Sequence, residues 1–376
     1  MELQNPFLIS GYTTPELFCD REKETTALVS AIKNHRNVTL FSYRRLGKTA
    51  LIKHVFHKLQ ATKKYSCFYI DVYSTQNLTE FVNQLGTAIV GKLDSTPSKA
   101  FQNIAEIFKS FRPLLQFDEL TGAPSVSFDF KNNSDLQKSI GSIFNYLQKK
   151  GKNKRIVIAI DEFQQITNYP EKNVEALLRS YIQPLNNISF VFLGSHKHLL
   201  HSMFTDVRRP FYQSTELMQL NKIGADKYGE FIKSVFAKYK RKIEPEALEK
   251  ILEWGALHTF YVQFICNKLF SEQHKTYTLD HVHGVLYAIL KEQELWFITN
   301  KKLLTEQQFQ LIKAIAKENG IRKTFSKGFI LKHKLSTAPT VARGLKALYD
   351  AELIYDDEVG YYVYDVFFAQ WLKRIL

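Results

Sequence analysis

The chain has 376 residues, enough for about two to three domains, and its 45% hydrophobic and 23% charged residues are typical of globular proteins. Its 51 Lys and Arg exceed its 37 Asp and Glu, a net charge of +14 that favours polyanionic partners such as nucleic acid, or simply reflects a solvated basic surface. Three widely spaced cysteines and no C-x-x-C argue against a zinc site or a disulfide framework. The purest apolar stretch, residues 156–160, is too short to span a bilayer, so we expect a cytoplasmic chain with no membrane partner.

Short apolar runs alternate with helical segments between residues 37 and 220, which predicts an α/β domain with a parallel sheet covered on both faces. A helix is expected over 50–59, directly after the first strand. A hairpin insertion around a Gly-containing turn is expected at about 114–130, within a first domain that spans 1–220. The five predicted strands lie at residues 38–41, 66–73, 155–161, 188–194 and 215–220.

Residues 42–49, SYRRLGKT, match the phosphate-binding pattern G-x-x-x-x-G-K-[ST] except that Ser42 replaces the first glycine. A strand before the loop and a helix after it would aim backbone N–H groups at phosphates. Lys48 would then reach the β- and γ-phosphates, and the Thr49 hydroxyl would bind Mg²⁺. A chance match on a solvated basic turn is the alternative. The predicted ATP-binding residues are Ser42, Tyr43, Arg44, Arg45, Leu46, Gly47, Lys48 and Thr49.

Two carboxylates, Asp161 and Glu162, follow the apolar strand predicted at 155–161. Acids at the carboxyl end of a buried parallel strand are costly unless they have a function. We predict that Asp161 helps to hold Mg²⁺ and that Glu162 polarises the water that attacks ATP. The alternative is a strand followed by an acidic helix start.

The remaining chain is predicted to form a helical lid over 221–298 and a winged helix-turn-helix over 299–376. Thr305 and Gln308 have the spacing of a capping box, and three short helices precede two β-rich pieces at 353–355 and 361–364. Eleven Lys or Arg against two Glu between 301 and 346 favour contact with DNA phosphates. Six acids between 350 and 365 argue against it, and a protein partner stays open. The tentative DNA contacts are Thr340, Arg343 and Lys346, on a recognition helix at about 337–351.

The loop at 42–49, the Asp-Glu-Phe-Gln run at 161–164 and the helical lid resemble the AAA+ superfamily of P-loop ATPases. More narrowly they resemble its archaeal ATPase group, which is related to the origin-recognition and STAND ATPases. Nearly the whole chain takes part in the resemblance. Residues 18–24 match the group's F-x-x-R-E-x-E element. Residues 362–365, Tyr-Val-Tyr-Asp, lie within its C-terminal Y-x-V-x-D motif, and residues 368–372 match its F-x-x-W-L motif.

This resemblance implies a sheet order of 5-1-4-3-2 and places Phe18 and Arg21 near the adenine. It puts Ser195 at the sensor-1 position, although a serine there can also cap the next helix. Arg208 would be an arginine finger for a neighbouring subunit, or part of a basic turn. The lid departs from the family's Gly-x-Pro element, so His258 either senses nucleotide or packs within the lid.

The resulting hypothesis is an ATP-hydrolysing AAA+ protein that binds ATP and Mg²⁺ between the sheet domain and the lid. Its nucleotide state would control a winged helix that binds double-stranded DNA or a protein partner, with a homo-oligomer as a further option. One alternative is a STAND-like nucleotide-dependent switch or scaffold with little turnover. Another is a transcription or replication regulator whose main output is DNA binding.

Overall fold

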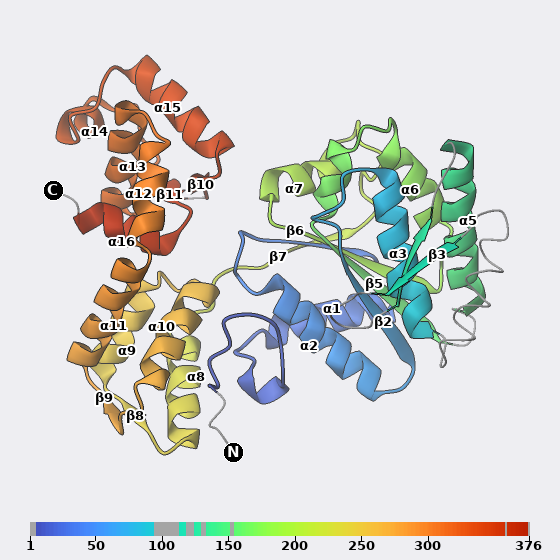
Figure 1. Ribbon diagram of the computed structural model, residues 1–376, viewed down its shortest axis with the longest axis horizontal. Coiled ribbons are helices and arrows are strands. Elements are labelled where there is room, and N and C mark those ends of the chain that lie inside the picture. Colours follow the sequence, from blue (N-terminus) through green and yellow to red (C-terminus); the bar gives the residue numbers. More distant parts are fainter. Residues whose placement is uncertain are drawn as a thin grey trace. The chain divides into compact units, whose positions relative to one another are not determined.

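The computed structural model describes residues 5–93, 113–117, 124–128, 133–150, 154–357 and 359–374. The chain divides into two compact units (Figure 1). The sheet unit is Gly11–Asn221, and the helical unit is Lys222–Leu376 together with Met1–Ser10. Among the described residues, no helix combines the length and the apolar character that crossing a membrane requires.

Five parallel strands form the central sheet in the order β2-β5-β6-β1-β7. Counted along the chain, this is 2-3-4-1-5, which is the predicted order read from the opposite edge. Parallel pairing brings the carboxyl ends of β1, β5 and β6 to one edge, where ligands of open α/β sheets bind. The strands are β1 (Val38–Phe41), β2 (Tyr65–Asp71), β5 (Arg155–Asp161), β6 (Ile188–Gly194) and β7 (Glu216–Gln219).

Both faces of this sheet are covered, as its continuous apolar strands predicted. Alternate residues of β5 enter opposite cores: Val157 and Ala159 join one, and Ile156 and Ile158 join the other. Burial on both sides explains why the strands lack a polar face. The first core contains α1 (Glu22–Lys33) and α2 (Lys48–Ala61), and the second contains α3 (Leu78–Leu93), α5 (Asn133–Lys150), α6 (Val174–Ile182) and α7 (Lys197–Thr205).

Most predicted boundaries in the sheet unit shift by a few residues. The helix after the phosphate loop begins at Lys48, and the second strand ends at Asp71 instead of residue 73. In the hairpin region, β3 (Pro113–Phe117) pairs antiparallel with β4 (Pro124–Phe128), while the predicted turn between them lies outside the described residues. Two short 3₁₀ helices, Pro15–Leu17 and Phe163–Asn168, complete this unit.

The helical unit begins with four helices, as the predicted lid required. It also contains a parallel pair of two-residue strands, which the sequence did not predict. Phe7 packs here on Phe236 and Phe270, so residues 5–10 join this unit although the first domain was predicted to start at residue 1. A further helix, α12 (Glu294–Lys302), runs through the boundary predicted at residue 298. The elements are α8 (Ala225–Lys238), β8 (Lys242–Ile243), α9 (Pro245–Trp254), α10 (Thr259–Ser271), β9 (Thr276–Tyr277) and α11 (Leu279–Glu292).

The C-terminal part has the winged-helix arrangement of three helices followed by an antiparallel strand pair. The predicted capping box is confirmed: the Gln308 amide N–H donates to Thr305 Oγ1 (3.3 Å) and the Thr305 amide N–H donates to Gln308 Oε1 (2.9 Å). Gly360 ends the wing turn at φ 151°, where a Cβ would lie 2.4 Å from the Ile321 backbone, so this turn needs glycine. The elements are α13 (Glu306–Glu318), α14 (Lys327–Lys332), α15 (Ala338–Asp350), β10 (Ile354–Asp356), β11 (Tyr361–Val363) and α16 (Val366–Arg374).

Candidate nucleotide and metal site

The phosphate-binding loop lies between β1 and α2 and does not need a glycine at its first position. Arg45 and Gly47 adopt positive φ angles of 63° and 94°, but Ser42 is not among the positive-φ residues. Gly47 is the N-cap of α2 in the left-handed conformation, which glycine adopts at low cost. The glycine that the motif retains is therefore the one that the backbone requires.

Ser42 also contacts the loop lysine. Lys48 is buried, and its Nζ lies 3.2 Å from Ser42 Oγ, 3.4 Å from Ser42 O and 3.5 Å from Tyr43 O. Burial lowers the pKa of Lys48, as does Arg44, whereas Glu162 and Asp161 raise it. The ammonium group thus rests on neutral oxygens, and an arriving phosphate would supply the negative charge that these oxygens lack.

The two predicted magnesium ligands lie side by side. Thr49 Oγ1 donates to Asp161 Oδ2 at 3.1 Å, and the hydroxyl of Tyr69 donates to the same oxygen. Burial and the Asp161 carboxylate raise the pKa of Tyr69, so its hydroxyl stays a neutral donor. A carboxylate and a hydroxyl are hard oxygen donors, the kind that Mg²⁺ prefers, so these residues fit the ion.

Tyr69 and Asp71 are site residues that the sequence reasoning missed. Both belong to β2, and Asp71 pairs in register with Asp161. Burial, Asp161 and Glu162 raise the pKa of Asp71, and its bond from the Tyr73 amide opposes them. The signal that could have found them is the predicted strand order, because it places β2 beside β5.

Glu162 lies beside Ser195, whose sensor-1 role towards the nucleotide stays a prediction. Ser195 donates to Glu162 Oε2 from its hydroxyl (2.9 Å) and its amide (3.2 Å), and the Gln164 side chain donates to the same oxygen. Arg44 Nε donates to Ser195 Oγ at 3.2 Å. The N-cap of α7 is His196, with no side-chain capping bond, so the serine side chain serves Glu162 rather than the helix. The strand ends thus bring Arg44, Glu162 and Ser195 together.

The Gln164 side chain is buried beside the end of β6 and donates a hydrogen bond to Glu162. A Cβ on Gly194 would lie 2.1 Å from Gln164 Oε1, so this strand end has room only for glycine while Gln164 keeps its place. In the sequence Gln164 is recognisable only as part of the Asp-Glu-Phe-Gln run, and no pattern indicates its contact with Glu162.

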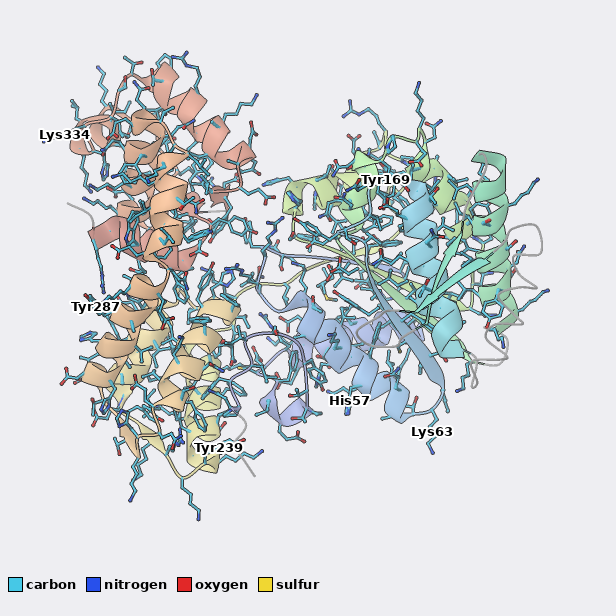
Figure 2. The ribbon with its side chains drawn as sticks, in the orientation of Figure 1. His57, Lys63, Tyr169, Tyr239, Tyr287 and Lys334 are labelled. Atoms are coloured by element: carbon cyan, nitrogen blue, oxygen red, sulfur yellow. The ribbon has the colours of Figure 1, made fainter. Side chains whose placement is uncertain are left out.

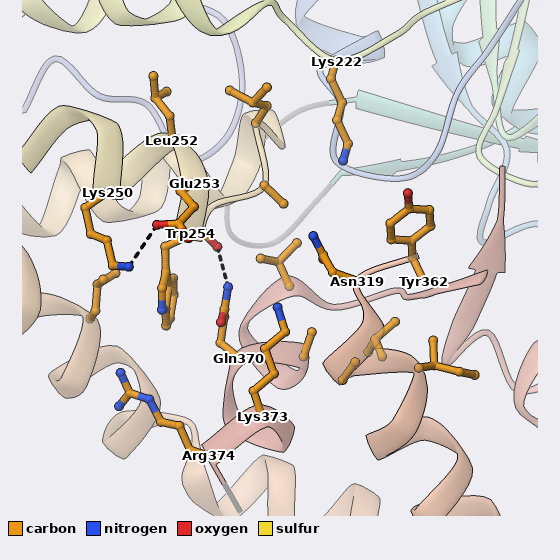
Figure 3. Close-up of a pocket in the computed structure, with 18 of the residues that line it drawn as sticks. Lys222, Lys250, Leu252, Glu253, Trp254, Asn319, Tyr362, Gln370, Lys373 and Arg374 are labelled. Atoms are coloured by element: carbon orange, nitrogen blue, oxygen red, sulfur yellow. Dashed lines mark hydrogen bonds and ion pairs between the residues drawn. The ribbon is translucent and has the colours of Figure 1, made fainter. Parts of the chain in front are cut away.

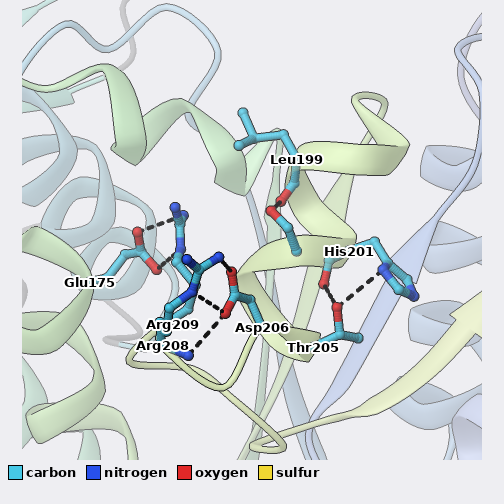
Figure 4. Close-up of polar contacts among 8 residues, drawn as sticks. Glu175, Leu199, His201, Thr205, Asp206, Arg208 and Arg209 are labelled. Carbon is cyan, nitrogen blue, oxygen red and sulfur yellow. Dashed lines mark hydrogen bonds and ion pairs between the residues drawn. The ribbon is translucent and has the colours of Figure 1, made fainter.

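Arg208 and Arg209 differ in how they are held (Figure 4). Arg208 forms two bonds to Asp206, Nε to Oδ1 at 3.0 Å and Nη2 to Oδ2 at 2.8 Å, and its side chain is 85% exposed. Arg209 is 28% exposed and pairs with Glu175 of α6 at 2.7 Å. Of this pair, Arg208 is the one whose side chain extends into solvent, and its role as an arginine finger stays a prediction.

The N-terminal element packs on the helix that follows the phosphate loop. Phe18 stacks on His54 of α2, with ring centroids 4.3 Å apart, and the Tyr12 hydroxyl bonds to His54 Nδ1 at 3.0 Å. Arg21 is buried and donates to Glu24 Oε1 (2.8 Å) and to the Asn221 carbonyl (2.6 Å). These contacts give Phe18 and Arg21 a structural role in attaching the N-terminal element. Their predicted contacts with adenine stay predictions.

His258 belongs to the helical unit, where it is buried at the N-cap of α10 and packs edge-on against Tyr261. Ala256 and Leu257 precede it with φ angles of 52° and 54°, and Thr259 begins the helix. The departure from Gly-x-Pro thus falls on a turn with two consecutive left-handed residues. A nucleotide-sensing role of His258 stays a prediction.

The winged helix presents part of its predicted DNA-contacting face. Arg343 and Lys346 are exposed on α15, whereas Thr340 is half-buried and its hydroxyl bonds to Thr337 Oγ1 at 3.1 Å. Lys334, in the turn between α14 and α15, is exposed as well (Figure 2).

Two of the acids near the wing are bound to their own backbone. Asp357 Oδ1 accepts from the amides of Val359 (2.8 Å) and Gly360 (3.2 Å). Asp365 accepts from the Phe368 amide (2.9 Å) and the Tyr261 hydroxyl (3.0 Å). These bonds fix the position of two acids but leave their negative charge, so the acidic wing still counts against phosphate contact.

Two family models match the chain. One, described as an ATPase domain predominantly from Archaea, matches residues 18–258, and one described as a probable winged helix domain matches residues 295–374. An uncharacterized ATP-binding protein of Methanocaldococcus jannaschii is 30% identical over 206 residues, 49% of this chain and 51% of that protein. A second from the same organism is 28% identical over 193 residues, 49% of this chain and 44% of the relative. The chain spans about half the length of the curated relatives it matches.

Solved structures share the fold over nearly the whole chain. The Walker-type ATPase of Pyrococcus abyssi superimposes with a TM-score of 0.68 at 18% identity, covering 98% of this chain and 99% of that one. The Aeropyrum pernix ORC2 protein, solved as ADPNP–ADP complexes, gives 0.60 at 15% identity, covering 99% and 96%. The Aeropyrum pernix ORC1 protein in complex with DNA gives 0.52 at 12% identity, covering 95% and 93%. At such identities the likeness is one of fold.

Proposed function

Since the chain belongs to the family of ATPase domains found predominantly in Archaea and carries an ATP-binding ATPase domain with a winged helix, we propose that it hydrolyses ATP with Mg²⁺. The observation that carries this proposal is the pairing of two acids at the end of β5. Asp161 accepts from Thr49, and the adjacent Glu162 accepts from Ser195. Metal-binding and water-activating groups therefore occupy neighbouring positions.

Each residue has a distinct task in the proposed reaction. Lys48 leaves the oxygens of Ser42 and Tyr43 and bonds to the β- and γ-phosphates. Thr49 and Asp161 would hold Mg²⁺, which neutralises charge on the phosphates when it is bound. Glu162 uses Oε2 for its protein bonds, which leaves Oε1 to orient the attacking water. Arg44 donates a hydrogen bond to Ser195, which places its positive charge close to Glu162 and the proposed position of the attacking water.

The Asp161→Asn variant tests this proposal. Asparagine keeps an oxygen for the Glu162 amide, which lies 2.9 Å from Asp161 Oδ1, but it loses the charge that would hold Mg²⁺. We expect phosphate release from ATP to fall by about tenfold or more in this variant, with part of the loss recovered at high Mg²⁺. Asp226→Asn, which removes the charge of an exposed acid on α8 in the helical unit, is the control and should release phosphate like wild type. Equal phosphate release by wild type and Asp161→Asn would refute the proposal.

The proposed partner of the winged helix is double-stranded DNA, with α15 in the major groove. Arg343 and Lys346 are exposed on that helix, and the Aeropyrum pernix ORC1 protein, which has a similar fold, was solved with DNA. A protein partner remains the competing proposal, because winged helices also mediate protein contacts.

The Arg343→Ala variant tests the DNA proposal by gel shift or fluorescence anisotropy over a range of salt concentrations. Loss of one arginine contact is expected to weaken duplex binding about tenfold and to reduce its salt dependence. Lys291→Ala, an exposed charge of α11, is the control and should bind DNA like wild type. The absence of any wild-type shift at low salt would leave a protein as the partner.

A nucleotide-dependent switch with little turnover is the second candidate function. The observation that favours it is the turn before α10, where Ala256 and Leu257 are both left-handed. Non-glycine residues in that conformation cost roughly 1–2 kcal/mol each, and such strain is found at switch regions. Tight ATP binding with negligible phosphate release, together with an ATP-dependent change in size on gel filtration, would support this function over hydrolysis.

A further inference from the structure

A cavity of about 740 Å³ lies in the helical unit, and its lining contains none of the residues assigned to ATP or Mg²⁺ (Figure 3). Its volume is in the range of small-molecule sites, about 300–1,000 Å³. The helical region contributes Glu253 and Trp254 at the end of α9, while the winged helix contributes Tyr362 of β11 and Lys373 of α16. A ligand here would therefore contact both parts of the unit.

The lining carries an excess of positive charge. Its cations are Lys222, Lys250, Lys373 and Arg374, and its one carboxylate is Glu253. Lys250 pairs with Glu253 at 2.9 Å, which leaves three cations. Within the described part of the chain, the side chains of these three have neither an ion-pair nor a hydrogen-bond partner.

The surroundings disfavour leaving these charges without a counter-ion. Lys373 is half-buried; desolvation lowers its pKa, and Glu253 opposes that shift. Lys222 is exposed at the rim, yet nearby protein atoms partly desolvate its ammonium group and lower its pKa, against the effect of Asp357. A bound anion would restore the solvation energy that these ammonium groups lose.

The wall of the cavity is fixed on both sides. Gln370 Nε2 donates to the Trp254 carbonyl at 3.1 Å, which ties α16 to the end of α9. Trp254 packs against Phe367 of α16, with ring centroids 5.5 Å apart. Asn319 and Tyr362 add neutral polar groups to the lining. Cations on a fixed frame, with amide and hydroxyl groups between them, are the means by which proteins recognise phosphate oxygens.

We propose that this cavity binds a small phosphate-bearing anion that bridges α9 and α16. Phosphate fits better than a single carboxylate, because three unpaired cations call for more than one negative charge. The bound anion joins the winged helix more firmly to the helical region. The cavity lining contains no residue of the phosphate-binding loop. A failure of this proposal would therefore not bear on ATP hydrolysis, and a failure of the hydrolysis proposal would not bear on this one.

Calorimetric titration of the full chain with inorganic pyrophosphate tests the proposal. A Lys48→Met background weakens binding at the phosphate loop and isolates the cavity. In that background we expect pyrophosphate to bind and to raise the melting temperature. Adding Lys373→Met and Arg374→Gln, which keep most of each side-chain stem, should weaken binding by about tenfold for each lost contact.

Lys238→Met, an exposed lysine of α8, is the matched control and should bind pyrophosphate normally. Far-UV circular dichroism checks folding, and Lys222→Gln at the rim serves as a second variant if the double substitution unfolds the chain. Tighter binding of ADP than of pyrophosphate would identify the phosphate source as a nucleotide, and equal binding would identify a free phosphate compound. The proposal is overturned if Lys48→Met alone abolishes binding, if the cavity variants bind like wild type, or if only a short DNA duplex responds to them.

Discussion

Glu162→Gln is expected to lower ATP turnover by about 100- to 10,000-fold, the usual contribution of a positioned general base, while ATP binding stays near wild type. Glutamine keeps an oxygen that can accept the bonds from Ser195 and Gln164, so the arrangement of the site is preserved. It cannot draw a proton from water. Binding should survive because the proposed phosphate contacts of Lys48, Thr49 and the loop amides do not involve this carboxylate.

Phosphate release and nucleotide affinity should be measured on the same preparation. Glu216→Gln is a suitable control, since Glu216 begins β7 at the opposite edge of the sheet and pairs with Arg36. It removes the same charge without touching the site and should hydrolyse ATP normally. If Glu162→Gln also retained normal turnover, the water-activating role would have to move to another residue.

Lys48→Met is expected to reduce ATP affinity by at least about tenfold and, at the same time, to raise the melting temperature of the nucleotide-free chain. Charge-assisted hydrogen bonds contribute about 1.5–3 kcal/mol each, and their loss accounts for the weaker binding. Stability rises because the buried ammonium rests only on neutral oxygens, and burial lowers its pKa. Each kcal/mol of stability gained adds roughly 2–4 °C for a domain of about 150–250 residues, which is the size range of the sheet unit that holds Lys48.

The stability that Lys48→Met gains over wild type depends on pH in a direction that the shifted pKa determines. The unfolded chain holds the Lys48 proton up to pH values near 10.5, whereas the folded chain releases it earlier. The destabilising effect of Lys48 is therefore complete below the lowered folded pKa and fades as the pH rises from that value towards 10.5. Calorimetric melting of wild type and Lys48→Met across that range checks the prediction. Lys53→Met, a half-buried lysine of the same helix, is the control. A Lys48→Met variant less stable than wild type would contradict it.

Local patterns explain why much of the fold could be predicted from the sequence. The continuous apolar strands and the loop at Gly47 depend on neighbours along the chain, and so does the capping box of Thr305. The strand order came from the family resemblance, and the sheet topology confirms it.

Contacts between distant segments account for what the sequence did not indicate. Tyr69 reaches Asp161 only because β2 and β5 pair in one particular register. The inward bonds of Asp357 depend on the geometry of the wing turn, whereas composition counted that residue only as a negative charge. Two-residue strands such as β8 and β9 are too short to leave any periodic signal.

The close approach of Gln164 to Gly194 constrains how this site can evolve. A Cβ at residue 194 meets the glutamine amide at 2.1 Å, so neither position can change freely while the other is kept. A larger residue at 194 would force the Gln164 side chain out of its present place or favour a shorter residue at 164, and either change would disturb the bond to Glu162. The two positions are thus expected to covary among relatives, and a lineage that replaced this glycine would need another group to hold the glutamate at position 162.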